Sequence, residues 1–174
     1  LSSFEKVYDY VLEVPEIFEK LAKKFMPGPL TLLLRKKDII PDLVTAGSPY
    51  VAVRIPSHPI TKSLLEKVDF PLAAPSANPF GYLSPTTAQH VAMQLGTKVA
   101  MILDGGKCAV GVESTIIKIE NDEVSVLRYG GIPVEEIEKE NGELEYHIYV
   151  YKIREDDQYI IDKYPDLLKV VDRD

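Results

Sequence analysis

The sequence predicts a layered α/β domain built on a mixed sheet. Helical and strand-like segments alternate along the chain without a strict repeat, which is typical of helices packed on a sheet. The chain has 174 residues, which fits one domain of ordinary size. Hydrophobic residues make up 45% of it and charged residues 27%, so an apolar core can form.

The first half of the chain carries the clearest periodic signals. Residues 4–12 and 16–26 are expected to be helices, and in the second Ile17, Leu21 and Phe25 recur at helical spacing. A proline-rich stretch then ends this helix, because proline cannot continue the hydrogen-bond ladder. Strands are expected at 30–34, 51–55, 99–103, 114–119 and 123–127, and further helices at 59–67, 86–95 and from Pro133.

Residues 1–140 are expected to form this domain, because the composition changes near Asn141. The tail, residues 141–174, is rich in Tyr, Glu, Asp and Lys. Within it, residues 145–153 have the pattern of a strand and residues 159–171 that of a partly amphipathic helix. The tail is therefore expected to extend the sheet or to form a small docking element.

The charge balance argues against a nucleic-acid-binding surface. The formal net charge is −7, whereas proteins that grip nucleic acid by its phosphates usually carry a basic excess or stripe. The nearest candidates, Lys23-Lys24 and Arg35-Lys36-Lys37, are short and separate. Direct binding of nucleic acid is therefore expected to be weak or absent, which leaves room for a small local patch.

The composition also suggests a cellular compartment. The chain has one cysteine, Cys108, so it forms no intramolecular disulfide, and a reduced, cytoplasmic setting is the simplest inference. No apolar run approaches the roughly 18 residues that a membrane crossing needs. The first ten residues lack the basic and apolar regions of a signal peptide. No membrane association is expected.

Two arginines stand at the ends of predicted strands. Arg54 interrupts the apolar strand 51–55, and its charge must find a partner because burial without one is costly. Its planar fork suits a carboxylate or a phosphate, although an edge-strand arginine could equally point to solvent or pair with an internal acid. Arg128 precedes Gly130-Gly131, so it offers a fixed cation beside an open loop.

A loop between two prolines and a glycine offers many donors. In residues 75–81, the side chains of Ser76 and Asn78 and the backbone around them suit phosphate oxygens. Just beyond the loop, Ser84 or Thr86 could instead cap the helix that follows. From the residues alone, capping is at least as good an interpretation as ligand binding.

The glycine-rich loop 104–115 could also approach a ligand closely. It lacks the Gly-Lys-Ser/Thr ending of a phosphate-binding P-loop, and it is not a dinucleotide-binding fingerprint. Cys108 lies within it without a histidine nearby in the sequence, so a structural role is favoured over catalysis. No metal site is expected from spacing, because the three histidines lie far apart: His58, His90 and His147.

Six short stretches, taken together, resemble the YrdC family of threonylcarbamoyl-AMP synthases. Each is weak evidence alone, but all six occur in the family's order and with similar separations over residues 16–137. The resemblance does not cover the tail. The stretches are Lys24-Phe25-Met26-Pro27-Gly28-Pro29-Leu30-Thr31, Val51-Ala52-Val53-Arg54-Ile55-Pro56, Ala74-Pro75-Ser76-Ala77-Asn78, Leu103-Asp104-Gly105-Gly106, Gly111-Val112-Glu113-Ser114-Thr115-Ile116 and Leu127-Arg128-Tyr129-Gly130.

The resemblance implies a YrdC-like twisted mixed sheet flanked by helices. It also implies a nucleotidyltransferase that makes threonylcarbamoyl-AMP from L-threonine, bicarbonate and ATP and releases pyrophosphate. A separate tRNA threonylcarbamoyl transferase would then move the threonylcarbamoyl group to an adenosine of certain tRNAs. Mg²⁺ is expected with the ATP, and positioning and charge neutralisation can supply most of the catalysis.

The resemblance further implies roles for individual residues. Arg54 would hold the threonine carboxylate, and Ser114 would contact the same amino acid. Ala74 and Tyr50 would line the pocket through backbone groups, although Tyr50 stands where the family has threonine. The implied threonine-binding set is Arg54, Ser114 and Ala74, and the implied ATP-binding set is Ser76, Asn78, Ser84, Arg128 and Tyr50.

Two departures from the family are expected to matter. Family members begin with a segment that carries a Lys-x-Arg motif and further strands, and the matched stretches here start after it. The domain is therefore expected to lack its N-terminal portion, and the 174 residues alone are expected to be inactive. Two-domain members also continue through a tyrosine-bearing linker that the tail does not match.

Three alternative functions remain open from the sequence. The first is the carbamoyl-adenylate handling domain of a carbamoyltransferase. The sequences of residues 76–79 and 113–116, however, are closer to those of the threonine-using branch of the family. The second is a double-stranded RNA-binding module without catalysis, against which the net charge of −7 argues. The third is a degenerate structural domain.

Overall fold

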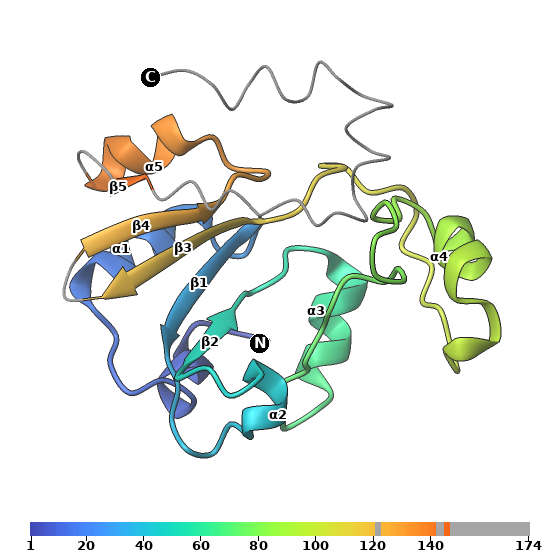
Figure 1. The fold of residues 1–174 in the computed structure, drawn as a ribbon, viewed down its shortest axis with the longest axis horizontal. Coiled ribbons are helices and arrows are strands. Elements are labelled where there is room, and N and C mark those ends of the chain that lie inside the picture. Colours follow the sequence, from blue (N-terminus) through green and yellow to red (C-terminus); the bar gives the residue numbers. More distant parts are fainter. Residues whose placement is uncertain (121–122, 142–144, 147–174) are drawn as a thin grey trace, which may run out of the picture.

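The computed structural model describes residues 1–120, 123–141 and 145–146, and a five-stranded mixed sheet forms its centre (Figure 1). The strand order is β2-β1-β3-β4-β5. The strands are β1 (Leu30–Arg35), β2 (Tyr50–Val53), β3 (Thr115–Glu120), β4 (Glu123–Arg128) and β5 (Glu145–Tyr146). The α-helices are α1 (Glu16–Phe25), α2 (Asp42–Thr45), α3 (Pro59–Glu66), α4 (Ala88–Leu95) and α5 (Val134–Asn141), and short 3-10 helices cover Glu5–Asp9 and Gly96–Lys98.

The strand directions bring the ends of four strands together at one edge of the sheet. β1 pairs in parallel with β3, with Leu30 opposite Thr115, and antiparallel with β2, with Leu32 opposite Val53. β4 runs antiparallel to β3, with Arg128 opposite Ile116. The N-terminal ends of β1 and β3 therefore meet the C-terminal ends of β2 and β4.

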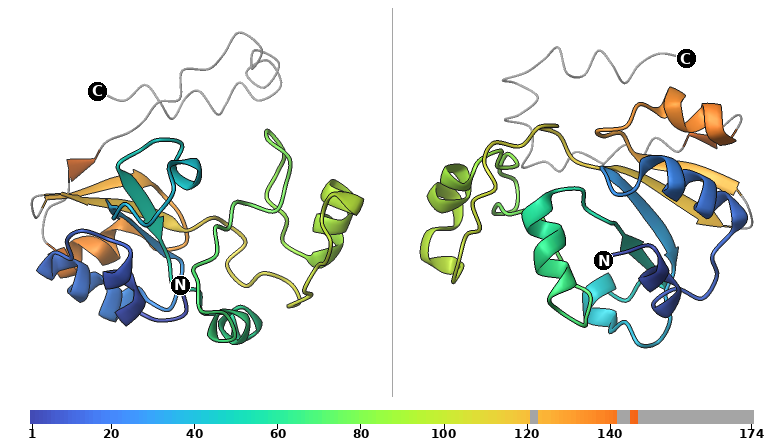
Figure 2. Two further views of the ribbon diagram at one scale, coloured as in Figure 1. Left: turned by 90° about the horizontal axis from the view of Figure 1, so that it is seen from below. Right: turned by 180° about the vertical axis from the view of Figure 1, so that it is seen from behind.

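One face of the sheet carries the core. α1 and α5 lie on this face in all views (Figures 1 and 2). The apolar side of α1 supplies Phe18, α5 supplies Ile137, and both pack with Leu32 and Ile117 of the strands, all with no exposed surface. Burial of four large side chains on one layer ties the helices to the sheet, because each buried aliphatic or aromatic side chain contributes about 1.5–3 kcal/mol.

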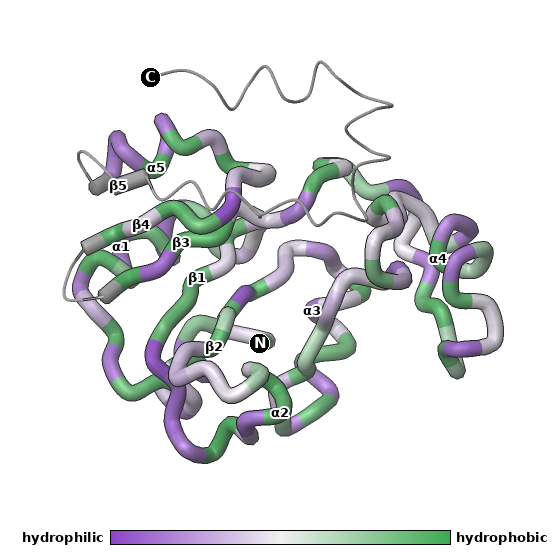
Figure 3. Tube along the Cα trace, viewed as in Figure 1, coloured by the Kyte–Doolittle hydropathy of each residue, from purple (hydrophilic) through white to green (hydrophobic). Residues whose placement is uncertain are grey.

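A long excursion, residues 54–114, connects β2 to β3. The excursion carries α3 and, farther out, α4, which lies away from the sheet in every view (Figures 1 and 2). Its hydrophobic residues are visible in Figure 3, and several are largely exposed, including Phe80 (93%) and Met101 (75%). The excursion is therefore not part of the core that α1 and α5 cover.

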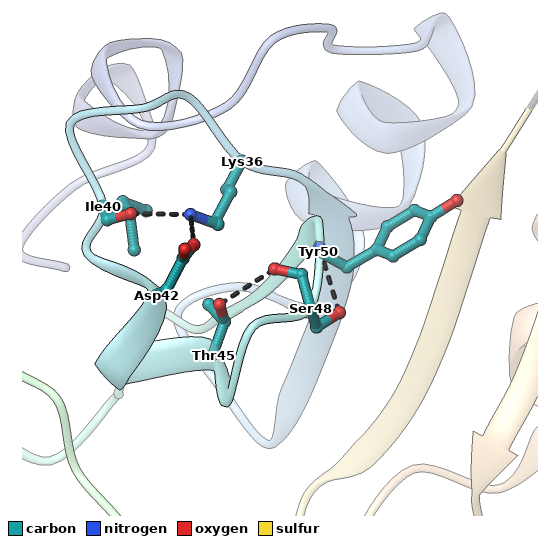
Figure 4. Close-up of polar contacts among 6 residues, drawn as sticks. All are labelled: Lys36, Ile40, Asp42, Thr45, Ser48 and Tyr50. Carbon is teal, nitrogen blue, oxygen red and sulfur yellow. Dashed lines mark hydrogen bonds and ion pairs between the residues drawn. The ribbon is translucent and has the colours of Figure 1, made fainter.

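The connection between β1 and β2, residues 36–49, contains α2 and is held by several polar contacts (Figure 4). The Lys36 ammonium group donates to the Ile40 carbonyl oxygen at 2.7 Å and contacts the Asp42 carboxylate at 2.8 Å. The Tyr50 backbone N–H donates to the Ser48 hydroxyl at 3.1 Å. These contacts fix the point at which β2 begins.

The predicted fold class is confirmed, and three element predictions need correction. The predicted strand 99–103 is wrong, because residues 99–103 have no regular structure. The predicted helix 4–12 shrinks to a 3-10 helix over Glu5–Asp9, since Val11 instead bridges to Lys36 beside β1. Between β1 and β2, where no helix is predicted from the sequence, the chain forms the short helix α2.

Two further outcomes concern the tail and the membrane. Most of the tail lies outside the described residues, including the helix predicted at 159–171 and all but the first two residues of the strand predicted at 145–153. Those two residues, Glu145–Tyr146, pair in parallel with β4 as β5. Across the described part of the chain, no helix has the length and hydrophobicity needed to span a membrane.

Candidate functional site

Arg54 stands immediately after β2, where the sheet meets the proline-rich turn before β1. Its Nε–H donates to the Gly28 carbonyl oxygen at 3.0 Å, and the Gly28 N–H donates to the Ile55 carbonyl oxygen at 2.9 Å. A side chain on Gly28 would lie 2.4 Å from the Phe25 carbonyl oxygen, so the turn requires glycine there. The anchored Nε leaves the two terminal nitrogens of Arg54 available to a carboxylate or phosphate.

Ser114 and Arg128 meet at the neighbouring strand ends. Arg128 donates from Nε to the Ser114 carbonyl oxygen at 3.0 Å and from Nη2 to the Ser114 hydroxyl at 2.9 Å. The same hydroxyl lies 2.7 Å from the Thr31 hydroxyl in β1. Ser114 and Thr31 are each 7% exposed, so this network is shielded from water and has a fixed geometry.

The backbone around Ser114 is held from both sides. The Thr115 N–H donates to the Pro29 carbonyl oxygen, and the Gly131 N–H donates to the Glu113 carbonyl oxygen, both at 2.9 Å. A Cβ atom on Gly130 would lie 2.4 Å from the Ser114 carbonyl carbon. The glycine pair after β4 therefore permits a close approach between two chain segments.

The two guanidinium groups concentrate positive charge at this edge. The pKa of Arg54 is lowered, first by partial burial of the group and then by the positive charge of Arg128. Among the described residues, neither arginine forms an ion pair with a carboxylate. Two neighbouring guanidinium groups that are not neutralised by an ion pair favour binding of an anion. The donor set suits a carboxylate or a phosphate.

Ser84 reaches the same edge from the excursion. Its hydroxyl donates to the Glu113 carboxylate in a short hydrogen bond. The pKa of Glu113 is lowered, mainly by this bond, then by a backbone N–H, and also by the charge of Arg128. Ser84 therefore caps no helix; Thr87 caps α4 instead, where its side chain accepts from the His90 N–H.

We expect the Ser84–Glu113 bond to be visible in a pH titration. Because the folded-state pKa of Glu113 lies below its unfolded value, the bond contributes above the unfolded pKa and is lost as pH falls through the lowered one. Ser84→Ala should raise the pKa of Glu113, measured by carbon-detected NMR of the carboxyl group. Glu136, whose pKa is lowered by Lys139, is the internal control and should not move. An unchanged Glu113 titration in Ser84→Ala would contradict the assignment.

Three predicted residues lie farther out in the excursion and are not brought to this edge by any described contact. Ala74 and Ser76 are exposed. The Asn78 side-chain amide donates to the carbonyl oxygens of Pro79 and Tyr82 at 3.0 Å, so its donors serve its own loop. Its Oδ1 atom is buried without a hydrogen-bond partner among the described residues. Their roles toward a ligand stay predictions.

Tyr50 lies at the other end of β2 from Arg54. Its ring contacts two cations, with Lys118 Nζ 4.5 Å and the Arg35 guanidinium carbon 5.5 Å from the ring centre. Figure 4 shows the ring extending from the start of the strand. Four residues of strand span roughly 13 Å, so Tyr50 is separate from the strand ends that carry Arg54, Ser114 and Arg128, which we call the two-arginine edge. The contact of Tyr50 with ATP stays a prediction.

Two residues of the site were not among the predicted set. Thr31 interrupts the apolar run of β1, as Arg54 interrupts the predicted strand 51–55, and this polar residue in an apolar run was the available signal. Glu113 precedes a predicted strand, and no pattern in the sequence indicated its contact with Ser84, which lies 29 residues earlier.

Comparison with known proteins identifies the family of this chain. A family model named for Sua5, YciO and YrdC and described as "Telomere recombination" matches residues 1–130. The chain belongs to the Sua5/YciO/YrdC family. The predicted resemblance is thereby confirmed, and the family match covers every residue of the two-arginine edge.

Relatives in this family carry a common name. A threonylcarbamoyl-AMP synthase of Pyrococcus abyssi is 48% identical over 151 residues, and that of Bacillus subtilis is 43% identical over 139 residues. The matches cover 87% and 79% of this chain. The chain spans only 44% and 40% of the length of these two family members.

Solved structures of the family agree with the fold. The crystal structure of Pyrococcus abyssi Sua5 complexed with L-threonine superposes with a TM-score of 0.83 at 48% identity, covering 86% of this chain and 44% of that one. Escherichia coli YciO superposes with a TM-score of 0.68 at 24% identity, covering 76% of this chain and 65% of that one. The second likeness supports the fold alone.

Proposed function

We propose that the protein containing this chain is a threonylcarbamoyl-AMP synthase, in which the two-arginine edge binds L-threonine and the triphosphate of ATP. The observation that carries the proposal is the pair Arg54 and Arg128, two anchored cations beside the buried Ser114, neither of which forms an ion pair with a carboxylate among the described residues. The relatives named as threonylcarbamoyl-AMP synthases support the substrate assignment.

Each residue has a simple task in this proposal. The terminal nitrogens of Arg54 hold the threonine carboxylate, and the Ser114 hydroxyl contacts the same amino acid. Arg128 stabilises the charge that develops on the phosphates. The threonine amine attacks the carbon of bicarbonate with loss of water, and the resulting carbamate oxygen attacks the α-phosphorus with loss of pyrophosphate. Such steps depend mainly on positioning and on fixed positive charge.

The two guanidinium groups and the Ser114 hydroxyl suit an anionic ligand. Among the described residues, no three His, Cys, Asp or Glu side chains gather in one place. In this proposal Mg²⁺ enters with ATP and is held by its phosphates. Ser84 approaches the nucleotide side, Ser76 and Asn78 lie on the loop before it, and Ala74 lines the pocket. The product would pass to a tRNA threonylcarbamoyl transferase in the cytoplasm.

The test is an assay of the full-length protein with L-threonine, bicarbonate and Mg-ATP. We expect pyrophosphate release that needs all three substrates, and a product with the mass of threonylcarbamoyl-AMP. The 174-residue chain alone is the comparison, and we expect it to be inactive. Pyrophosphate release that requires carbamoyl phosphate in place of threonine and bicarbonate would favour carbamoyl-adenylate handling. Steeply salt-dependent RNA binding without turnover would favour the RNA-binding alternative.

A further inference from the structure

Thr31 places a buried hydroxyl on the same face of the sheet as Arg128. In the sheet register Thr31 is opposite Ile116, and Ile116 is opposite Arg128. Paired residues of adjacent strands point to the same face, so the three side chains form a row across β1, β3 and β4. Ser114, two residues before Ile116, shares this face.

The hydrogen bonds of the Ser114 hydroxyl can be arranged in two ways. A serine hydroxyl has one proton and two lone pairs, and Arg128 Nη2 already donates to one lone pair at 2.9 Å. The Thr31 hydroxyl lies 2.7 Å away, and either oxygen can be the donor. If Ser114 donates to Thr31, only a lone pair of Ser114 faces a ligand. If Thr31 donates to Ser114, the Ser114 proton is free for a ligand.

An anion at this edge selects the second arrangement. A carboxylate only accepts hydrogen bonds, so a lone pair of Ser114 would repel it and the Ser114 proton would attract it. With Thr31 and Arg128 both donating to it, Ser114 also becomes a stronger donor, because hydrogen bonds in a chain polarise one another. Both residues are only 7% exposed, which limits competition from water for either hydroxyl.

We propose that Thr31 is a positioning residue that donates to Ser114, so that Ser114 presents its proton to the carboxylate of the amino-acid substrate. The inference rests on the proposed function and adds to it a residue that never touches the substrate. The inference requires a hydroxyl group at position 31 for binding of the amino-acid substrate. A side chain that has only the shape of threonine should not be enough.

The experiment compares Thr31→Val and Thr31→Ser with the full-length wild-type protein. We expect Thr31→Val to weaken L-threonine binding by roughly 10- to 100-fold, the loss typical of a hydrogen bond to a charged group. ATP affinity should stay within about threefold, because Arg128 keeps its own contact with Ser114. Thr31→Ser restores the hydroxyl and should recover most of the threonine affinity. Calorimetric titration with L-threonine and with ATP separates the two effects.

Thr45→Val is the matched control, because Thr45 is also a threonine with a hydrogen-bonded hydroxyl, here donating to the Ser48 carbonyl oxygen at 2.9 Å in the β1–β2 loop. It should leave threonine binding unchanged. Threonine affinity in Thr31→Val equal to that of the wild type would overturn the inference. So would a Thr31→Ser variant as weak as Thr31→Val, since shape would then be the cause. A wild-type protein that binds no threonine would instead sink the proposed function.

Discussion

Arg54→Ala in the full-length protein is expected to lower threonine-dependent pyrophosphate release by at least about 100-fold. The variant removes the only group at this edge whose two terminal nitrogens are both unused by described contacts, and truncating one partner of such a charged pair typically costs about 3 kcal/mol. ATP affinity should remain largely intact, because Arg128 is retained. Steady-state assays with varied threonine and calorimetric titration with ATP measure the two quantities.

The same variant should not unfold the protein. Arg54→Ala removes the hydrogen bond to the Gly28 carbonyl oxygen, but it also removes the cost of burying the guanidinium group and its repulsion by Arg128, both of which lower the pKa of Arg54. Because these effects oppose each other, loss of activity with little change in resistance to urea is the expected result. Lys20→Ala, which removes a positive charge from an exposed pair with Glu16 on α1, is the control and should leave turnover intact. Unchanged turnover in Arg54→Ala would disprove the role of Arg54.

Gly130→Ala is expected to destabilise the fold by about 3 kcal/mol, at the upper end of overpacking costs. The new methyl group would lie 2.4 Å from the Ser114 carbonyl carbon and 2.5 Å from the Glu113 carbonyl oxygen. Both are backbone atoms, so neither can rotate away. Urea unfolding measures the loss, and threonine affinity should fall with it because Ser114 is displaced.

Gly106→Ala provides the comparison for this prediction. Gly106 has a φ of +82°, but a Cβ atom there would meet nothing within 4 Å. Its substitution should cost about 1 kcal/mol through backbone conformation alone. If the two variants lost the same stability, crowding against Ser114 would not be the reason that glycine is required at position 130.

The sequence was a good guide where a polar residue broke an apolar pattern. Arg54 and Arg128 could be placed at strand ends from the sequence, and the structure puts both at one edge of the sheet. The contact between Thr31 and Ser114 could not be predicted, because the two residues are 83 positions apart and meet only through the pairing of β1 with β3.

The wrong strand at 99–103 has a physical explanation. Its residues have the β-branched and apolar composition of a strand, but strand preference depends on a neighbouring strand and on burial. No strand of the described sheet lies beside them, and Met101 and Leu103 are 75% and 54% exposed. The composition of residues 99–103 could not show that they have no neighbouring strand in the described sheet.

A Lys-x-Arg spacing occurs in the tail, at Lys152-Ile153-Arg154. It follows the matched stretches, whereas the family places its motif before them, and it lies outside the described residues. It is therefore not a substitute for the N-terminal motif.

The parallel pairing of β1 with β3 also determines when the site can exist during folding. The hydroxyl pair Thr31–Ser114 closes a loop of 83 residues, and contacts of such long range slow folding because the chain must lose entropy before it gains them. The entropic penalty rises only with the logarithm of loop length, about 0.6 kcal/mol for each doubling. The excursion can therefore lengthen or shorten during evolution at little thermodynamic cost, while the strand register that assembles the anion site must be kept.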